Sequence, residues 1–502
     1  MSTSALRVAP PQDPSHTPRS AGPRIALIMV SLILAIVPVQ LDALVAATAL
    51  PTIAGDLGGF GMLAWIATAY LLAMAVGTIV AGRLGDLTGR RTMLLTSLAV
   101  FGIGSALSGL APSMGVLIAS RALQGLGAGM TFTNLLAVVA DVAPPEKRAR
   151  YHGIVASIAP VSMLVGPWVG GLITDHLSWR WIFWLNVPLV ALSLLGVAAL
   201  VRLPAPVARG RLDIAGLVLA AVTGSGVVLA VTWGGNQYAW HSWQVLTAAA
   251  VAVAALVALI GVERRAEQPV LPLTLFRQRS VVLALVILAI GMGAVLMTAT
   301  NYLPMFLELV RGRSAADSGL LLLPLLLPGI ATGLLVGRWT TTGGRMRTAM
   351  IVGTSALTVA SALLASMSPT TPGLLTATYQ VLAGVGIGML FQTPMVLIQN
   401  SVERAEVGAA SGTAGFVRML GAAVGTGALG SVFSATVQGR LPHGLDAGTL
   451  TPSVVAGLPP EAMAAVRDAV AAGSSVLFLV MAGLSALALL AALAVPRHRT
   501  VV

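Results

Sequence analysis

Apolar stretches of about 20 residues recur along almost the whole chain, and short polar connections separate them. Each stretch is long enough to cross a hydrocarbon core of roughly 30 Å as a helix. The stretches are continuously apolar, without the alternation that marks the strands of a transmembrane barrel. The pattern therefore predicts an all-α polytopic membrane protein. We expect fourteen spans: 25–50, 63–82, 92–110, 115–141, 152–174, 181–201, 213–233, 243–262, 280–307, 317–337, 348–367, 373–398, 408–438 and 474–495.

The segments outside these spans are mostly short. Residues 1–23 hold several prolines and no apolar run, which is typical of a disordered tail. The first apolar run is too long for the core of a signal peptide, so we expect it to remain as a span. A second tail covers 497–502. The longest connection is the outer loop 439–473, which contains an amphipathic stretch from Pro460 to Val470 and is too short for a domain.

An internal repeat divides the chain. Gly82-Arg-Leu-Gly-Asp-Leu-Thr-Gly-Arg90 parallels Gly337-Arg-Trp-Thr-Thr-Thr-Gly-Gly-Arg345, and Gly125-x-Gly-x-Gly-Met-x-Phe132 parallels Gly384-x-Gly-x-Gly-Met-x-Phe391. Both matches fall at the same topological place in the span order. The simplest arrangement is two six-helix pseudo-repeat halves, 24–201 and 279–496, with two additional spans and an inner linker at 202–278. Related parallel halves are typical of transporters whose substrate site lies between them near the midplane.

Composition narrows the chemistry. Apolar residues make up 57% of the chain and charged residues 9%, against roughly 25% in a soluble protein. The chain has no cysteine, its six histidines are scattered, and its one lysine, Lys147, follows Glu146 and not the glycine of a P-loop. We therefore expect no catalytic residues, no metal site and no bound cofactor. A membrane-embedded enzyme would need catalytic side chains clustered at one depth, and the sequence offers none.

The net charge of +12 is a signal of membrane orientation. With the N-terminus taken as cytoplasmic, the inner segments hold 22 of the 29 Lys and Arg residues and the outer segments hold five. The positive-inside rule then predicts that both termini are cytoplasmic. We expect a multi-pass protein of the bacterial plasma (inner) membrane, with no nucleic-acid partner and no obligate protein partner.

Two charged residues lie deep in the first half. Inserting a charged side chain at the bilayer centre costs roughly 2.5–3.5 kcal/mol, so each of them is expected to have a structural or functional role. Asp42 lies well inside the first span, and Arg121 lies at comparable depth in the fourth. One interpretation makes Asp42 a proton carrier tuned by Arg121, so that the proton is the coupling ion. The alternative is a structural ion pair that never titrates.

The second half has lost ionisable groups at the repeated positions, because Asp86 corresponds to Thr341 and Arg121 to Gln380. Arg418 remains within its spans, either to touch anionic substrate atoms or to fix packing through carbonyl groups. Glu308 lies at the outer rim of the ninth span. With no deep acid in the second half, we expect neutral or monocationic amphipathic substrates. Candidate pocket residues are the polar side chains within spans: Gln40, Asn134, Asn301, Tyr302, Gln392 and Arg418.

The segment from Gly82 to Arg91 carries glycines suited to a tight inner turn, and its acid and base can pair with neighbouring helices. Its spacing resembles the signature loop of the major facilitator superfamily. Arg121-Ala-Leu-Gln-Gly-Leu-Gly-Ala-Gly129 resembles the second motif of that superfamily. The resemblance implies a gate that holds the halves together in the outward-open state. Its residues would be Gly82, Gly85, Asp86, Gly89 and Arg90.

Other segments resemble the 14-span drug:proton antiporter branch. They are Leu41-Asp42 through Leu50-Pro51, Trp179-Arg-Trp-Ile-Phe-Trp-Leu-Asn-Val-Pro188, Asp213-Ile-Ala-Gly216 and the stretch from Leu273 to Arg279. The fifth span resembles the antiporter motif, with serine in place of one glycine. Its small residues and proline let another helix approach closely, and in that branch they hinder leak. The residues concerned are Gly153, Ser162, Gly166, Pro167, Gly170 and Gly171.

These observations favour a proton-coupled exporter of small amphipathic or hydrophobic compounds, which we expect to act in multidrug efflux by rocking alternating access. An exporter of one metabolite, lipid-linked compound or siderophore on the same fold is the alternative, because fold does not fix substrate. A sensor that no longer transports should have lost Asp42 and the signature segment, and both are present.

Overall fold

The computed structural model is all-helical. It describes residues 22–496, apart from 58–61, 144, 157, 204–212, 235–237, 267–270, 314, 340–342, 404–405 and parts of 443–456. The tails predicted at 1–23 and 497–502 therefore lie outside the described residues, except for Gly22 and Pro23, which begin the first helix. The helix order along the chain follows the predicted order of spans.

The first half is built from α1 (Gly22–Leu57), α2 (Leu63–Thr88), α3 (Arg90–Gly109), α4 (Met114–Val142), α5 (Pro145–Ala156), α6 (Ile158–His176), α7 (Arg180–Trp184) and α8 (Asn186–Leu200). A hairpin of α9 (Ile214–Trp233) and α10 (Trp243–Glu263) follows, and then the short helix η2 (Leu273–Arg277). The second half is built from α11 (Arg279–Ile287), η3 (Leu288–Val295), α12 (Leu296–Leu309), α13 (Ala315–Leu320), α14 (Leu323–Trp339), α15 (Gly343–Ala365), α16 (Gly373–Asn400), α17 (Val407–Gln438) and α19 (Pro460–Ala494).

Twelve helices of the described residues are long and apolar enough to cross a membrane. The predicted spans 152–174 and 317–337 are not among them. The first is shared between α5 and α6, and the second matches α14, whose apolar stretch, Leu323–Gly337, is shorter than the others. The count of fourteen spans stays a prediction.

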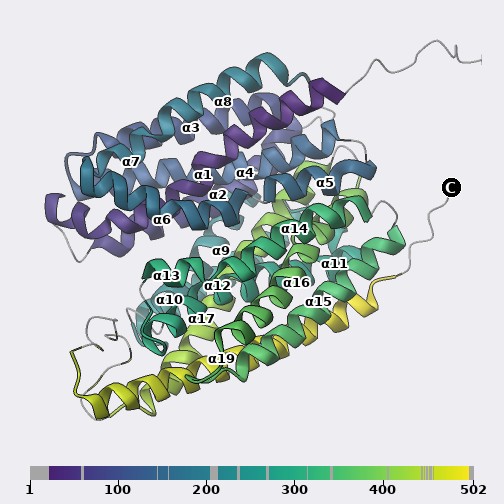
Figure 1. The fold of residues 1–502 in the computed structure, drawn as a ribbon. Coiled ribbons are helices and arrows are strands. Elements are labelled where there is room, and N and C mark those ends of the chain that lie inside the picture. Colours follow the sequence, from purple (N-terminus) through teal and green to yellow (C-terminus); the bar gives the residue numbers. More distant parts are fainter. Residues whose placement is uncertain are drawn as a thin grey trace, which may run out of the picture.

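The two halves form separate bundles (Figure 1), and the beginning of α1 and the end of α19 lie toward the same end of the molecule. The repeat in the sequence corresponds to a repeat in packing. Gly125 and Gly129 of α4 lie against the backbone of α2, and Gly384 and Gly388 of α16 lie against the backbone of α14. A side chain at any of these glycines would collide with the facing helix, so the two halves use the same close approach.

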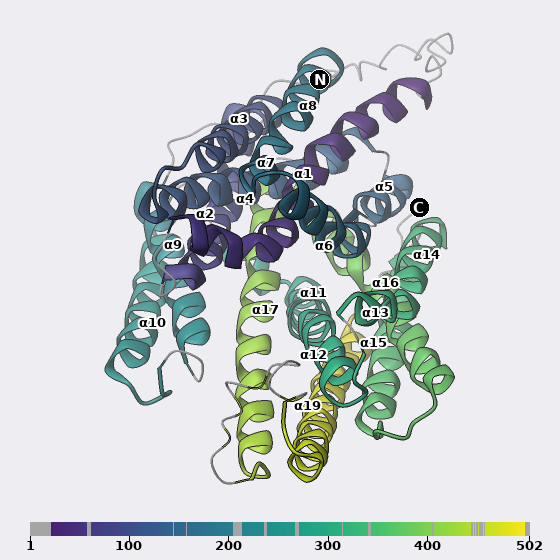
Figure 2. The same cartoon turned by 60° about the vertical axis from the view of Figure 1, so that its left-hand side comes forward.

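The halves meet at one end of the molecule, which we call the closed end. There α5 packs against α14 and the C-terminal part of α2 against the N-terminal part of α17. Two glycine pairs let the backbones approach: Gly153 faces Gly333, and Gly82 faces Gly408. Toward the opposite end, which we call the open end, the bundles diverge (Figures 1 and 2). The close backbone contacts between Gly153 and Gly333 and between Gly82 and Gly408 therefore lie at the closed end.

The hairpin of α9 and α10 lies beside the boundary between the halves (Figure 2). Helix α9 packs on α2 of the first half and on α17 of the second. At the open end Trp65 of α2 meets Trp233 of α9 edge to face, with ring centroids 6.0 Å apart. Trp240 donates a hydrogen bond of 2.9 Å to Ser431 of α17. The hairpin is therefore anchored to both halves.

Two segments predicted as loops are helical. The signature segment forms the last turns of α2, and the chain reverses at Gly89 alone, whose φ of 94° lies in the region that favours glycine. The helix continues because Asp86 and Arg90 find partners on other helices and need no loop. The stretch from Pro460 to Val470 forms the first turns of α19, because its apolar face is buried through Val466, Ala469 and Val470.

Candidate functional site

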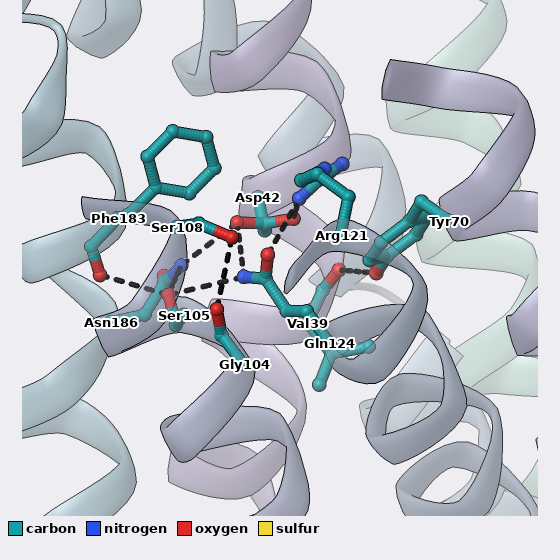
Figure 3. Close-up of polar contacts among 10 residues, drawn as sticks. All are labelled: Val39, Asp42, Tyr70, Gly104, Ser105, Ser108, Arg121, Gln124, Phe183 and Asn186. Atoms are coloured by element: carbon teal, nitrogen blue, oxygen red, sulfur yellow. Dashed lines mark hydrogen bonds and ion pairs between the residues drawn. The ribbon is translucent and has the colours of Figure 1, made fainter. Parts of the chain in front are cut away.

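A cluster of polar side chains is buried in the first half, where four elements converge (Figure 3). Helix α1 supplies Asp42, α3 supplies Ser105, α4 supplies Arg121 and Gln124, and α8 supplies Asn186. Asp42 is 1% exposed and Arg121 is 2% exposed. On α4, Arg121 and Gln124 are three residues apart and therefore share a helix face.

The carboxylate of Asp42 receives hydrogen bonds from three side chains. Arg121 forms an ion pair with Oδ2. Gln124 donates to Oδ1 over 2.7 Å, and Asn186 donates to the same oxygen over 2.9 Å. A carboxylate accepts hydrogen bonds at both oxygens, and here both oxygens are engaged by side-chain donors.

The rest of the cluster holds these groups in place. Ser105 accepts hydrogen bonds from both amides, each of 3.0 Å, and donates to the carbonyl of Phe183. The guanidinium of Arg121 lies over the ring of Tyr70, 4.2 Å from its centroid, and its Nη1 also donates to Gln124. A buried arginine held on one side by a carboxylate and on the other by an aromatic face is fixed in position.

The predicted partners Asp42 and Arg121 thus meet directly, but Gln124, Asn186 and Ser105 were absent from the predicted site. A signal for two of them existed: Gln124 lies one helical turn beyond Arg121, and Asn186 is a lone amide in an apolar span. What the sequence could not give is the convergence of α3, α4 and α8 on one carboxylate.

A cavity of about 230 Å³ lies between the halves. Its walls are mostly apolar and include the two aromatic residues that correspond in the repeat, Phe132 and Phe391. Of the predicted pocket residues, Gln40, Gln392 and Arg418 line it. Its position between the two bundles matches the expected place of a substrate site.

The other three predicted pocket residues do not line this cavity. Asn134 is buried between α2 and α4, where its amide donates to the carbonyl of Met130. Asn301 is exposed and donates to the carbonyl of Met297. Tyr302 packs on Phe433, with ring centroids 5.1 Å apart. Asp42 and Arg121 also lie outside the cavity wall.

Asp86 joins the halves at the closed end. Its Oδ2 accepts the backbone N–H of Ala409 over 2.9 Å, and its Oδ1 accepts that of Gly408 over 3.2 Å. These N–H groups belong to the first turn of α17, where a helix has unpaired donors and a partial positive charge. Asp86 therefore acts as a capping carboxylate supplied by the other half.

Arg90 supports this contact from the same half. It donates to Asp86 over 3.0 Å and pairs with Asp141 of α4 over 2.7 Å. The predicted glycines have different structural roles. Gly82 allows the close approach of α17, Gly85 lies against Asn134, and Gly89 forms the turn between α2 and α3. We call Asp86, Arg90 and the first turn of α17 the latch.

The residues of the predicted antiporter motif are divided between two places. Gly153 of α5 lines the cavity and faces α14, since a Cβ there would lie 2.9 Å from the carbonyl oxygen of Gly333. Ser162, Gly166 and Gly170 are buried in α6, which packs on α1. Pro167 and Gly171 also belong to α6, and their side-chain surroundings lie outside the described residues.

Each half has a polar tie at the open end. Asp56 accepts hydrogen bonds from Trp179 over 2.9 Å and from Arg180 over 2.7 Å, and these two bonds lower the pKa of its carboxyl. In the second half, Arg311 donates to the carbonyl of Thr371 over 2.6 Å and to the hydroxyl of Thr376. Partial burial, with the neighbouring charge of Arg313, lowers the pKa of Arg311.

No metal centre is formed in the described part of the chain, where no three His, Asp or Glu side chains gather closely enough to bind an ion. The buried acids are instead engaged by arginines and amides, as with Asp42 and Asp86. The arrangement offers buried acids paired with arginines, a mostly apolar cavity between the halves, and a contact that joins the halves at the closed end.

Comparison with known proteins connects this geometry with a family. The family model described as Major Facilitator Superfamily matches residues 32–426. An uncharacterized MFS-type transporter of Mycobacterium tuberculosis is 35% identical over 495 residues, which cover 94% of this chain and 71% of the relative. The multidrug transporter protein MdtP of Bacillus subtilis is 32% identical over 409 residues, which cover 82% of this chain and 75% of the relative.

Solved structures agree with the fold. The proton:xylose symporter XylE superimposes with a TM-score of 0.63 at 13% identity, covering 94% of this chain and 96% of the symporter. The human organic anion transporter TETRAN superimposes with a TM-score of 0.62 at 15% identity, covering 94% and 99%. Identities this low show a shared fold alone and carry no information about the substrate.

Proposed function

Because this chain belongs to the major facilitator superfamily of small-molecule transporters, we propose that it is a proton-coupled exporter of small amphipathic compounds. The observation that carries the proposal is Asp42, an acid buried in the membrane region and held by Arg121, Gln124 and Asn186. The names of relatives such as MdtP favour efflux of drugs over uptake of nutrients.

Exchange requires a group that binds a proton in one conformation and releases it in another. Burial away from water disfavours a charged carboxylate, whereas a nearby guanidinium and amide donors favour it. Here the donors come from α4 and α8 and the acid from α1, so a small relative movement of these helices changes the balance. Asp42 is the proton carrier in this proposal, and Arg121 with the two amides sets which form is stable.

The driving force is sufficient. Each unit of pH gradient contributes about 1.4 kcal/mol per proton, and each 100 mV of membrane potential contributes about 2.3 kcal/mol per charge. In the proposed cycle the latch is closed while the cavity is open to the outside. Protonation of Asp42 from that side precedes opening of the latch and release of the proton inside.

The location belongs to the proposal as well. We place the chain in the bacterial inner membrane with both termini in the cytoplasm, because 22 of 29 Lys and Arg residues fall on one side of the predicted spans. The closed end is then cytoplasmic. A reporter that works only in the cytoplasm should be active when it is fused after Arg265. Activity of a periplasm-specific reporter at the same position would reverse the orientation.

The test of coupling uses everted membrane vesicles from a pump-deficient bacterial host that expresses the chain. The probe is the neutral fluorophore N-phenyl-1-naphthylamine, and a protonophore collapses the gradient. Wild-type vesicles should accumulate the probe, and Asp42→Asn vesicles should lose that accumulation while containing the same amount of folded protein. The control is Asp56→Asn, which removes an exposed acid from the same helix and should leave accumulation unchanged. Protonophore-sensitive accumulation by Asp42→Asn at the wild-type level would refute the proposal.

The alternative is export of one specific metabolite or lipid-linked compound by the same coupling. The mostly apolar cavity favours the broader substrate range, because its few polar groups impose little directional selection. A panel of chemically unrelated amphipaths in the same vesicles separates the two: several transported compounds support the broad range, and a single one supports the alternative.

A further inference from the structure

Arg418 lies in the wall of the central cavity, and no carboxylate among the described residues forms an ion pair with it. Arg418 lies eleven residues after the beginning of α17, roughly 16 Å along the helix. That places it near the middle of a ~30 Å hydrocarbon core. In the part of the chain that the structure describes, its guanidinium forms no ion pair and no side-chain hydrogen bond, and its contact is with the ring of Phe132, 4.8 Å from the centroid.

The acids of the described membrane helices do not offset this charge. Asp42 is engaged by Arg121, and Asp86 by Arg90 and the first turn of α17. Neither lines the cavity, and Glu308 of α12 does not line it either. The polar neighbours of Arg418 in the wall are the amides of Gln40 and Gln392, which are neutral. The cavity therefore presents one positive charge and no negative one along its described walls.

Such a charge is expensive in the membrane unless something compensates it. The face of Phe132 supplies part of the compensation, since a cation over an aromatic ring gains roughly 0.5–2 kcal/mol. The planar guanidinium still presents donors in a fork that matches a carboxylate or sulfonate. Arg418 also lines a second, smaller pocket together with Phe132, Phe391 and Gln392. Its side chain is therefore accessible from the cavity.

We propose that the cavity binds a compact amphipathic monoanion, whose carboxylate or sulfonate pairs with Arg418 and whose apolar part lies between Phe132 and Phe391. The proposal rests on the proposed export function and names its substrate class. It ranks monoanions above the neutral and monocationic substrates expected from the sequence, because that expectation considered the missing acids of the second half and not the charge that remains there. The volume of about 230 Å³ favours compact ligands, because ligand pockets commonly measure about 300–1,000 Å³.

Three ring-matched probes test the charge preference: 1-naphthoate, neutral 1-naphthamide and cationic 1-naphthylmethylammonium. Binding is measured by titration calorimetry on the full chain in nanodiscs of phosphatidylcholine at one pH. The wild type should bind 1-naphthoate about tenfold more tightly than 1-naphthamide, and 1-naphthylmethylammonium most weakly. Equal binding of the three probes, or preference for the cation, would overturn the proposal.

Two substitutions locate the preference. Arg418→Met removes the charge at similar length and should reduce 1-naphthoate affinity to that of 1-naphthamide, while leaving 1-naphthamide binding unchanged. Arg418→Lys keeps the charge and should keep the preference for the anion. The control is Arg440→Met, which removes an exposed arginine just beyond α17 and should change nothing. An anion preference that survives Arg418→Met would show that Arg418 serves packing alone.

The outcome is independent of proton coupling, because binding is measured without a gradient. If Asp42→Asn still pumps, the coupling proposal fails and the anion preference at Arg418 stands or falls on its own data. If Arg418→Met does not fold, the ranking of the three probes by the wild type and by Arg418→Lys still decides the proposal.

Discussion

Gly125 and Gly129 of α4 lie against α2 in the first half, and Gly384 and Gly388 of α16 lie against α14 in the same way in the second. At the position that corresponds to Arg121, however, the second half carries Gln380, whose Oε1 accepts no hydrogen bond in the described part of the chain. The first half buries two networks of acids and arginines. The second half contributes one arginine to the cavity.

The comparison separates the packing of the helices from their charges. Helix approach depends on glycines, which both halves keep, and so one architecture serves both. A buried acid needs a complete set of hydrogen-bond and charge partners. The first half provides such a set around Asp42. The division suits a transporter in which one half carries the coupling ion and the cavity between the halves carries the substrate.

The largest expected difference lies between Arg121→Met and Gln380→Met, two substitutions at corresponding positions. Arg121→Met leaves Asp42 buried without its cation, and breaking a buried pair typically costs about 3–5 kcal/mol. We expect the midpoint of thermal unfolding to fall by several degrees. We also expect proton-driven export to be lost or its pH optimum to shift. Gln380→Met should change the midpoint by about one degree or less, because a partly unpaired buried amide contributes little. Equal losses in the two variants would show that the halves do not differ in this way.

The next difference concerns the latch. Asp86→Asn removes a charged cap from α17, and a cap contributes about 1 kcal/mol, which corresponds to a roughly fivefold shift in a conformational equilibrium. The chain has no cysteine, so spin labels at Arg150→Cys and Arg345→Cys report the distance between the halves at the closed end without background. We expect longer distances to gain population in Asp86→Asn, with reduced transport by a folded protein.

The matched control is Asp141→Asn, which removes a partner of Arg90 within the first half and leaves the contacts of Asp86 with α17 in place. Its distance distribution should resemble that of the parent. If both variants shift equally, the arginine network within the first half, and not the cap across the halves, governs closure.

The smallest difference is a response to acid at the open end. The pKa of Asp56 is lowered in the folded protein, so its contacts with Trp179 and Arg180 stabilise the fold at pH above the unfolded value of about 4. That contribution is lost as pH falls through the folded pKa. The partners of Arg311 in the second half are a carbonyl and a hydroxyl, which do not titrate there.

The thermal midpoint of the wild type should therefore exceed that of Asp56→Asn by about one degree or less near pH 6, since the pair is exposed. This gap should narrow as the pH falls below the unfolded pKa of about 4. The gap between the wild type and Arg311→Met should stay constant over the same range. A gap for Asp56→Asn that grows as pH falls would have the wrong sign for this account.

The sequence predicted much of this arrangement, because apolar length and charge placement respond directly to the membrane. The bounds of α4 and α17 agree with the predicted spans to within a few residues, and Asp42 and Arg121, matched by depth alone, form a pair. The residues from Gly82 to Thr88 were assigned to a loop because they are polar, yet they are helical, since the carboxylate of Asp86 has partners on α3 and α17.

The site was harder to predict than the spans. Asn186 and Ser105 reach Asp42 only through the packing of α8 and α3 on α1 and α4, which no periodicity specifies. The π-helical segment Leu288–Val295 likewise has no local sequence signal that separates it from the α-helix around it. Tertiary contacts determine both features.

The cap that Asp86 places on α17 has an evolutionary consequence. Its acceptor oxygens bind backbone N–H groups of Gly408 and Ala409, which every residue except proline provides. Side chains along α17 can therefore change in evolution without loss of the contact between Asp86 and the first turn of α17. The lining of the cavity at Arg418 can change with them. The exceptions are the glycines where α17 packs closely on other helices: a larger residue at 408 would collide with the carboxylate and with Gly82, and one at 412 would crowd Gly82 and Thr78. Because the latch depends on the side chain of Asp86 and on main-chain groups of α17, other side chains of α17 can change under selection for new substrates.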